Sequence, residues 1–207
     1  MVRLRHQLRQ SLRLSRRSLT SAQQQAAAHG LAQQLSKLPK LSSWRHVGLY
    51  WPADGEIDPS LFARLLYKRG IKLYLPVIAP RKHDHRLHFL AAPAMAYASK
   101  NRRQLRLQPW PAKRNRFGLR EPLGRQVMRP EKLDALLIPL VGFDANGQRL
   151  GMGGGFYDRL LARLQCGVKR PQLIGLAHRS QQALALPTEQ WDEPVDIVVT
   201  DAGHLRR

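Results

Sequence analysis

The 207-residue sequence has a single cysteine, Cys166, and no apolar run that approaches the roughly 20 residues needed to cross a bilayer. One cysteine excludes an internal disulfide framework and a zinc site built from several cysteines, and it fits a reducing compartment. The basic N-terminus is not followed by an apolar stretch, so it does not have the pattern of a secretory signal. We therefore expect a cytoplasmic protein that does not associate with membranes.

Acidic residues are also scarce, and none precedes Asp54. The chain has 35 Lys and Arg against 14 Asp and Glu, which gives a formal net charge of +21. A second basic segment covers residues 100–129, with Glu121 as its only acid. Such charge attracts polyanions, so nucleic acid, nucleotide phosphates and a polyanionic small molecule are all candidate ligands. The 43% hydrophobic content favours a folded domain over a disordered basic tail.

The first 36 residues contain no proline and have leucines at four-residue spacing, which favours helices. Thr20 suits a helix N-cap, because a glutamine three residues later can complete a capping box. We predict helices at about 3–17 and 21–36. The first of these carries Arg5 and Arg9 one helical turn apart.

Apolar segments that alternate with helical ones predict an α/β fold. A third helix is expected to end at Arg69, with Asp58 as N-cap and Pro59 at its first position, and a fourth is expected at 155–164. Segment 91–128 is expected to be mostly irregular. Strands are expected at 46–51, 71–77, 86–90, 134–141, 172–177 and 195–199, the last being the final strand.

This alternation predicts a mostly parallel sheet between two layers of helices, a Rossmann-like three-layer arrangement. We expect one domain over residues 1–207, with the basic helix 3–17 packed on the α/β body. Ligands of such sheets bind at the carboxyl ends of the strands. The loops that follow Trp51, Val141 and Ala177 are therefore the places to look for a site.

The most distinctive stretch is the glycine-rich segment 142–159, which follows a predicted strand and opens a predicted helix. Glycines let backbone amides approach a ligand closely, and a helix N-terminus favours anions. The segment lacks the Gly-Lys-Ser/Thr ending of a Walker A loop and the placement of the dinucleotide-binding fingerprint. A packing loop without a ligand is the alternative. The flanking Arg149 and Arg159 favour an anion site over that alternative.

Residues 149–159 (RLGMGGGFYDR) resemble the signature of 5-formyltetrahydrofolate cyclo-ligases, and the similarity extends over nearly the whole chain. Two positions depart from the pattern. Some members carry lysine where this chain has Gly154, and Phe156 stands where tyrosine is commoner. Further matching segments are Arg5 to Arg9, 16–20, 50–51, 55–58, 115–122, 175–178, Gln181, 186–187, 191–192 and 195–196.

The resemblance implies an α/β enzyme that uses ATP and Mg²⁺ to convert 5-formyltetrahydrofolate to 5,10-methenyltetrahydrofolate, ADP and phosphate. Phosphorylation of the formyl oxygen would activate the carbon for ring closure by the neighbouring amine. The substrate is expected to carry a polyglutamate tail, and the enzyme is expected to be a monomer. We further expect part of the basic segment, including Arg114 and Arg116, to border that tail.

The resemblance also implies roles for individual residues. Arg149 and Tyr157 would be catalytic. Trp51 and Glu56 would bind the folate, and Asp158 and Asp192 would hold Mg²⁺. ATP would be bound by Arg5, Arg9, Arg149, Leu150, Gly151, Met152, Gly153, Gly154, Gly155, Phe156 and Tyr157.

Simpler interpretations stay open at this point. The two N-terminal arginines can form a solvated helix face, Glu56 can be a turn residue, Asp158 can complement the helix dipole, and Asp192 can be a surface acid or a salt-bridge partner. An RNA-binding or ribosome-associated protein would also use the basic segments, although no RRM or KH signature is present. Non-specific nucleic-acid binding is compatible with an enzyme, and an ATP-binding regulator without turnover is a third possibility.

Overall fold

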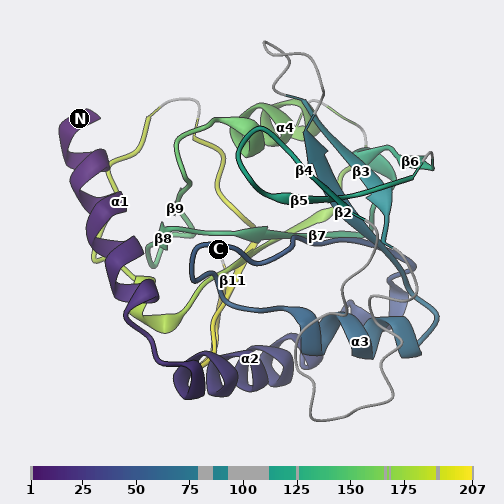
Figure 1. Cartoon of the computed structure of the whole chain (residues 1–207), viewed down its shortest axis with the longest axis horizontal. Helices are drawn as coiled ribbons and strands as arrows, with labels where there is room; N and C mark the ends of the chain where they lie inside the picture. The colour runs from purple at the N-terminus through teal and green to yellow at the C-terminus, as the bar shows by residue number, and fades with distance from the viewer. Residues whose placement is uncertain are drawn as a thin grey trace.

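The computed structural model describes residues 2–78, 86–92, 112–124, 126–165, 167, 169–189 and 192–206. Cys166, Trp191 and residues 100–111 of the basic segment lie outside these ranges. The described residues form an eight-stranded sheet in the order β12-β11-β10-β7-β1-β2-β3-β6 (Figure 1). Its strands are β1 (His46–Gly48), β2 (Lys72–Ile78), β3 (Leu87–Ala91), β6 (Val127–Met128), β7 (Ala135–Pro139), β10 (Gln172–Leu176), β11 (Ile197–Val199) and β12 (His204–Arg206).

The five strands β2, β1, β7, β10 and β11 run parallel, which confirms the prediction of a mostly parallel sheet. Strands β3, β6 and β12 are antiparallel additions at the two edges. The prediction that 195–199 contains the last strand was wrong, since β12 follows it. All three residues of β12 are exposed, so this edge strand lacks the apolar pattern that marked the buried strands.

Helices cover both faces of the sheet, as the three-layer prediction required (Figure 1). On one face lie α2 (Ser21–Ser36) and α3 (Ser60–Lys68), whose Leu31, Leu35 and Phe62 pack into the larger core cluster. On the other face α4 (Phe156–Gln165) buries Leu161 and Leu164. Among the described residues no helix combines the length and the apolar character that spanning a membrane requires.

The two N-terminal helices match their predicted bounds, with α1 at Val2–Arg17. The capping box at Thr20 is confirmed, because Gln23 N donates to Thr20 Oγ1 at 3.2 Å and Thr20 N donates to Gln23 Oε1 at 2.8 Å. The predicted N-cap of the third helix was wrong by one position. The Asp58 carboxylate accepts from Ser60 N at 2.8 Å, so Pro59 takes the N-cap position and α3 begins at Ser60.

The segment predicted to be mostly irregular contains a hairpin of β4 (Ala112–Arg114) and β5 (Arg120–Pro122). Its turn depends on Asn115, whose side-chain oxygen accepts from Phe117 N at 2.9 Å and Leu119 N at 3.1 Å. Gly118 completes the turn with φ +75°. A second short hairpin joins β8 (Gly142–Phe143) to β9 (Arg149–Leu150) and leads into the glycine-rich loop.

Candidate functional site

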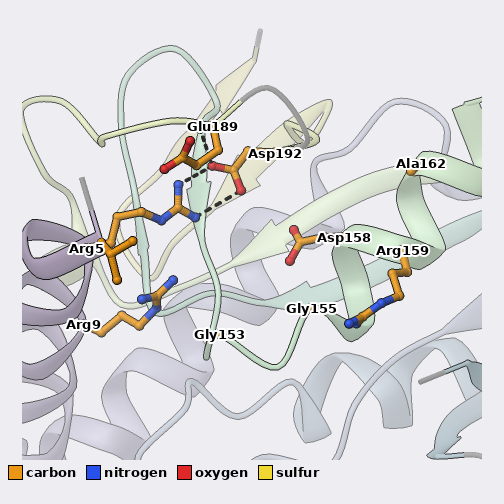
Figure 2. A pocket seen from close by; sticks show the side chains of 10 residues that line it. Arg5, Arg9, Gly153, Gly155, Asp158, Arg159, Ala162, Glu189 and Asp192 are labelled. Carbon is orange, nitrogen blue, oxygen red and sulfur yellow. Dashed lines mark hydrogen bonds and ion pairs between the residues drawn. The ribbon is translucent and has the colours of Figure 1, made fainter. Parts of the chain in front are cut away.

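Residues from both ends of the chain meet at a cavity of about 420 Å³, which we call the arginine cavity. Helix α1 supplies arginines from one side, while the glycine-rich loop and the start of α4 form the opposite wall (Figure 2). The residues that carry its charge are Arg5, Arg9, Asp158, Arg159, Glu189 and Asp192. This cavity brings together six predicted site residues that lie up to 187 positions apart in the sequence.

Arg5 and Asp192 form an ion pair at the mouth of the arginine cavity (Figure 2). Arg5 Nη2 donates to Asp192 Oδ1 at 3.0 Å, and Arg5 Nη1 also donates to the carbonyl of Pro187 at 2.8 Å. The hydrogen bond to Asp192 raises the pKa of Arg5. Burial opposes ionisation of Asp192, but hydrogen bonds from Arg5 and from Glu189 N outweigh it and lower the pKa of the carboxyl.

Arg9 lies one helical turn further along α1, and its Nε donates to the carbonyl of Gly151 at 2.8 Å. Burial lowers the pKa of Arg9, and repulsion from Arg5 lowers it further. A desolvated guanidinium beside a second one is stabilised by a bound anion. The electrostatics of the arginine cavity therefore favour a phosphate-bearing ligand.

Two residues of the glycine-rich loop that line the arginine cavity have backbone conformations that require glycine. Gly153 has φ +91° and Gly155 has φ +65°, a region that L side chains rarely adopt. A Cβ on Gly155 would also lie 2.6 Å from Arg159 Nη1, and that guanidinium donates to the carbonyl of Gly154 at 3.1 Å. Helix α4 begins directly after Gly155, so its positive end lies beside the arginines.

Arg149 and Leu150, both predicted to bind ATP, lie behind the loop and are not among the residues that line the arginine cavity. The side chain of Arg149 is only 3% exposed, forms an ion pair with Asp158 and donates from Nε to the carbonyl of Glu193 at 2.8 Å. The side chain of Leu150 is fully buried, in a cluster with Leu12. Both side chains support the loop from below, and their role in ATP binding stays a prediction.

A second cavity of about 620 Å³, which we call the Glu56 cavity, lies between α1, the first turns of α2 and the loop after β1. It contains the predicted residues Trp51 and Glu56, and it adds Arg120 from β5 and Gln24 from α2. The guanidinium carbon of Arg120 lies 5.7 Å from the centroid of the Trp51 ring, a cation–π arrangement. Arg120 was missed because it was one arginine among many in a strongly basic segment.

Glu56 is the most perturbed acid of this cavity. Its side chain is 12% exposed, Ala53 N donates to its Oε2 at 3.1 Å, and Arg16 Nη2 lies 3.8 Å from its Oε1. Burial raises the pKa of Glu56 to about 7, although Arg16 acts in the opposite direction. A carboxylate with so little solvation gains from N–H donors of a ligand.

Tyr157 is the second residue of α4. Burial raises the pKa of its hydroxyl, the charge of Glu56 raises it further and Arg149 opposes the shift. The hydroxyl therefore remains a hydrogen-bond donor at neutral pH.

Two further residues predicted to bind ATP make contacts with other parts of the chain. Phe156 packs against Phe117 of the β4–β5 turn with ring centroids 5.6 Å apart, and Met152 accepts a weak hydrogen bond from Arg16 at 3.9 Å.

A family model described as the 5-formyltetrahydrofolate cyclo-ligase family matches residues 2–201. The chain belongs to this family. It is 39% identical over 198 residues to the 5-formyltetrahydrofolate cyclo-ligase of Haemophilus influenzae, covering 94% of this chain and 97% of that relative. The corresponding protein of Escherichia coli K12 is 35% identical over 191 residues, covering 91% and 96%.

Solved structures of the cyclo-ligase family have the same fold. The 5,10-methenyltetrahydrofolate synthetase of Aquifex aeolicus superposes with a TM-score of 0.76 at 28% identity, over 98% of this chain and 92% of that one. The synthetase of Mycoplasma pneumoniae gives a TM-score of 0.70 at 23% identity, over 95% and 98% of the two chains. The prediction of family and fold is confirmed.

The arginine cavity suits magnesium only in combination with phosphate oxygens. Asp158 and Asp192 line the same cavity, but no group of three or more His, Cys, Asp and Glu that could hold a metal occurs in the part of the chain that the structure describes. Mg²⁺ is commonly bound through one or two carboxylates together with substrate phosphates and water. The donor set of the arginine cavity fits that mode.

Proposed function

We propose that this cyclo-ligase binds the phosphates of ATP in the arginine cavity and 5-formyltetrahydrofolate in the Glu56 cavity. Its activity is that of the family, the ATP-dependent conversion of 5-formyltetrahydrofolate to 5,10-methenyltetrahydrofolate. The observation that carries the assignment of the cavities is the meeting of Arg5, Arg9 and the glycine-rich loop around one anion-favouring space. The single cysteine fits a cytoplasmic location.

In the arginine cavity, Arg5 and Arg9 would neutralise phosphate charge, and Gly153 and Gly155 would let the backbone approach it. Asp158 and Asp192 would hold Mg²⁺, which supplies charge neutralisation at the phosphates when bound. Each of these carboxylates also pairs with an arginine, so the ion pairs hold them in position before the ligands arrive.

In the Glu56 cavity, the Glu56 carboxylate would accept hydrogen bonds from N–H groups of the pterin ring, and Trp51 would contact an aromatic face of the substrate. The charge of Glu56 contributes to the raised pKa of Tyr157, so the two side chains interact electrostatically, and we propose that a substrate bound in this way reaches toward Tyr157. The reacting formyl group would thus lie on the side of the cavity that faces α4 and the glycine-rich loop.

The proposed reaction has two substitution steps. The formyl oxygen attacks the γ-phosphorus, a P–O bond forms, and the bond to the departing ADP breaks. The neighbouring amine nitrogen then attacks the formyl carbon, the C–O bond breaks, phosphate leaves, and the nitrogen gives up its proton. Phosphoryl transfer depends mainly on positioning and charge neutralisation. Tyr157 would donate a hydrogen bond to the transferring group, while Arg149 would position Asp158.

The nucleotide assignment predicts that Arg9→Met raises the KM for ATP about ten-fold and leaves the KM for the folate unchanged, since a charged hydrogen bond to phosphate is lost. Formation of the methenyl product can be followed by absorbance with ATP, Mg²⁺ and 5-formyltetrahydrofolate. The exposed Arg3, on the same helix, supplies the control variant Arg3→Met. A folate KM that rises as much as the ATP KM in Arg9→Met would contradict the assignment.

We further propose that Arg120 recognises the carboxylates of the glutamate tail, in place of Arg114 and Arg116. Arg120 lines the Glu56 cavity, whereas Arg114 donates to the carbonyl of Gly118 at 2.6 Å and Arg116 lies over the Phe117 ring. Arg120→Gln is expected to raise the KM for a triglutamate substrate about ten-fold with little change in kcat. Arg114 lies opposite Arg120 in the β4–β5 hairpin, so Arg114→Gln is the matched control. An unchanged KM in Arg120→Gln would refute this role.

A further inference from the structure

Arg16, near the end of α1, has a side chain with no solvent exposure. Its guanidinium donates three hydrogen bonds to two separate segments of the chain. Nε donates to the carbonyl of Asp54 at 2.8 Å, Nη2 donates to Asp54 Oδ2 at 2.7 Å, and Nη1 donates to the carbonyl of Leu140 at 3.2 Å. Leu140 follows β7 at the carboxyl edge of the sheet, so this arginine joins α1 to the sheet and to the loop after β1.

The same guanidinium reaches a residue of the Glu56 cavity and a residue of the glycine-rich loop. Nη2 lies 3.8 Å from Glu56 Oε1 and 3.9 Å from the sulfur of Met152. Burying an arginine is costly unless its donors are satisfied, and here each of its three nitrogens donates. A buried cation that contacts both the turn of Glu56 and the glycine-rich loop suggests a role in positioning these two segments.

The turn that carries Glu56 has a conformation that depends on α1. Asp54 has φ +53° and Gly55 has φ +73°, and a Cβ on Gly55 would lie 3.1 Å from the carbonyl oxygen of Arg16. Asp54 also pairs with Arg13 at 2.8 Å and with Arg17. Burial disfavours the charge of Asp54, but these three arginines outweigh it and lower its pKa to about 2. The clamp around Asp54 therefore persists over the whole physiological pH range.

We propose that Arg16 is a positioning residue that fixes Glu56 in the folate cavity and favours the charged form of its carboxylate. Arg16 also fixes the position of that cavity relative to the glycine-rich loop. The proposal rests on the proposed function of Glu56. It extends that function to a residue that does not line the cavity in which Glu56 acts. It also gives α1 two tasks, since Arg5 and Arg9 of the same helix line the arginine cavity.

The charged and titratable groups that act on Glu56 come from every element packed around it. Arg13 and Arg16 of α1 favour its carboxylate form, and Asp54 of its own turn disfavours it. Burial and the charge of Glu56 raise the pKa of Tyr50, which follows β1, and of Tyr157 in α4, so both hydroxyls stay neutral. His178, whose Nε2 lies 3.2 Å from the carbonyl of Gly55, has its pKa lowered by burial and is neutral at pH 7.

These neighbouring charges predict that two substitutions shift the pKa of Glu56 in opposite directions. Removal of the Arg16 charge in Arg16→Met raises the pKa of Glu56 above its value of about 7, so folate recognition is lost at a higher pH. Removal of the Asp54 charge in Asp54→Asn lowers that pKa, so recognition extends to a lower pH. A purely structural role of the clamp would not move the two profiles in opposite directions.

The test is the pH profile of kcat/KM for 5-formyltetrahydrofolate at saturating ATP. We expect the acidic limb to move up by about one pH unit in Arg16→Met, a roughly five-fold loss at pH 7, and to move down in Asp54→Asn. Arg16→Lys, which keeps the charge but loses the planar fork, is expected to keep the limb and raise the folate KM. Arg69→Met, an exposed arginine at the end of α3, is the control.

The outcomes separate this proposal from the function it rests on. A normal folate KM in Glu56→Gln would refute the role of Glu56 itself. A raised KM in Glu56→Gln together with unmoved limbs in Arg16→Met and Asp54→Asn would overturn the role of Arg16. If Arg16→Met does not fold, Arg16→Lys decides alone: a raised folate KM with the limb in place supports the proposal, and an unchanged folate KM overturns it.

Discussion

Asp158→Asn is expected to lower kcat by about 100-fold or more while the protein stays folded. Asp158 lines the arginine cavity from the first turn of α4, and its side chain is 30% exposed. The substitution keeps its shape but removes the charge that we assign to Mg²⁺ binding. Arg149, its partner, keeps the hydrogen bond to the carbonyl of Glu193, so the loop retains a support. Steady-state assays over a magnesium titration measure the effect.

Glu131→Gln is a matched control for Asp158→Asn, because Glu131 is a partly exposed acid that pairs with Arg163 at 3.2 Å. It is expected to leave kcat and the magnesium dependence unchanged. A thermal melt of each variant separates loss of chemistry from loss of fold. A wild-type kcat in Asp158→Asn would refute the metal assignment. Arg149→Ala is a less clean test, since its buried guanidinium also contributes to the stability of the loop.

Glu56→Gln is expected to raise the folate KM by about ten- to a hundred-fold at pH 8 and to stabilise the folded protein at the same pH. The KM rises because a charged acceptor of substrate N–H groups becomes a neutral amide. The stability rises because Glu56 is charged and poorly solvated above its pKa of about 7. A competitive binding measurement and thermal melts at two pH values check the two effects.

The direction of the stability effect follows from proton linkage. The pKa of Glu56 rises from 4.5 to about 7 on folding, so between these values the folded state binds more protons than the unfolded state. The wild-type protein therefore loses stability as the pH rises through this window, by at most about 3 kcal/mol. The gain in Glu56→Gln should be present at pH 8 and absent at pH 5. A loss of stability at pH 8 would contradict the burial argument.

The fold could be predicted wherever burial leaves a pattern in the sequence. The five parallel strands are apolar runs because both of their faces are covered, and the capping box at Thr20 is a local signal that needs no tertiary context. Strand β12 left no such pattern, since its residues are exposed. The β4–β5 hairpin depends on hydrogen bonds of one asparagine side chain, which alternation of apolar residues does not reveal.

The candidate site was predictable in its composition but only in part in its geometry. The glycine-rich loop, Arg5, Arg9, Asp158 and Asp192 do meet around one cavity. The direction of a side chain is a tertiary property, so the sequence could not show that Arg149 points behind the loop. Nor could it distinguish Arg16, which is fully buried, among 35 basic residues whose pattern is mostly that of a solvated surface.

The position of α1 in the fold explains part of the net charge of +21. Five of the six arginines of this helix have a place in the proposed site. Two of them face the space assigned to phosphates, and three hold the turn that carries Glu56. In this proposal one basic helix would serve both substrates, which gives much of its charge a task other than binding nucleic acid.

In the proposed site, nucleotide and folate occupy two different cavities that share α1. A crystal structure of the enzyme with ADP, Mg²⁺ and 5-formyltetrahydrofolate is the decisive test of this arrangement. We expect ADP phosphates beside Arg9 and Gly153, and the pterin ring hydrogen-bonded to Glu56. Phosphates bound beside Trp51, or a pterin ring that does not contact Glu56, would contradict it.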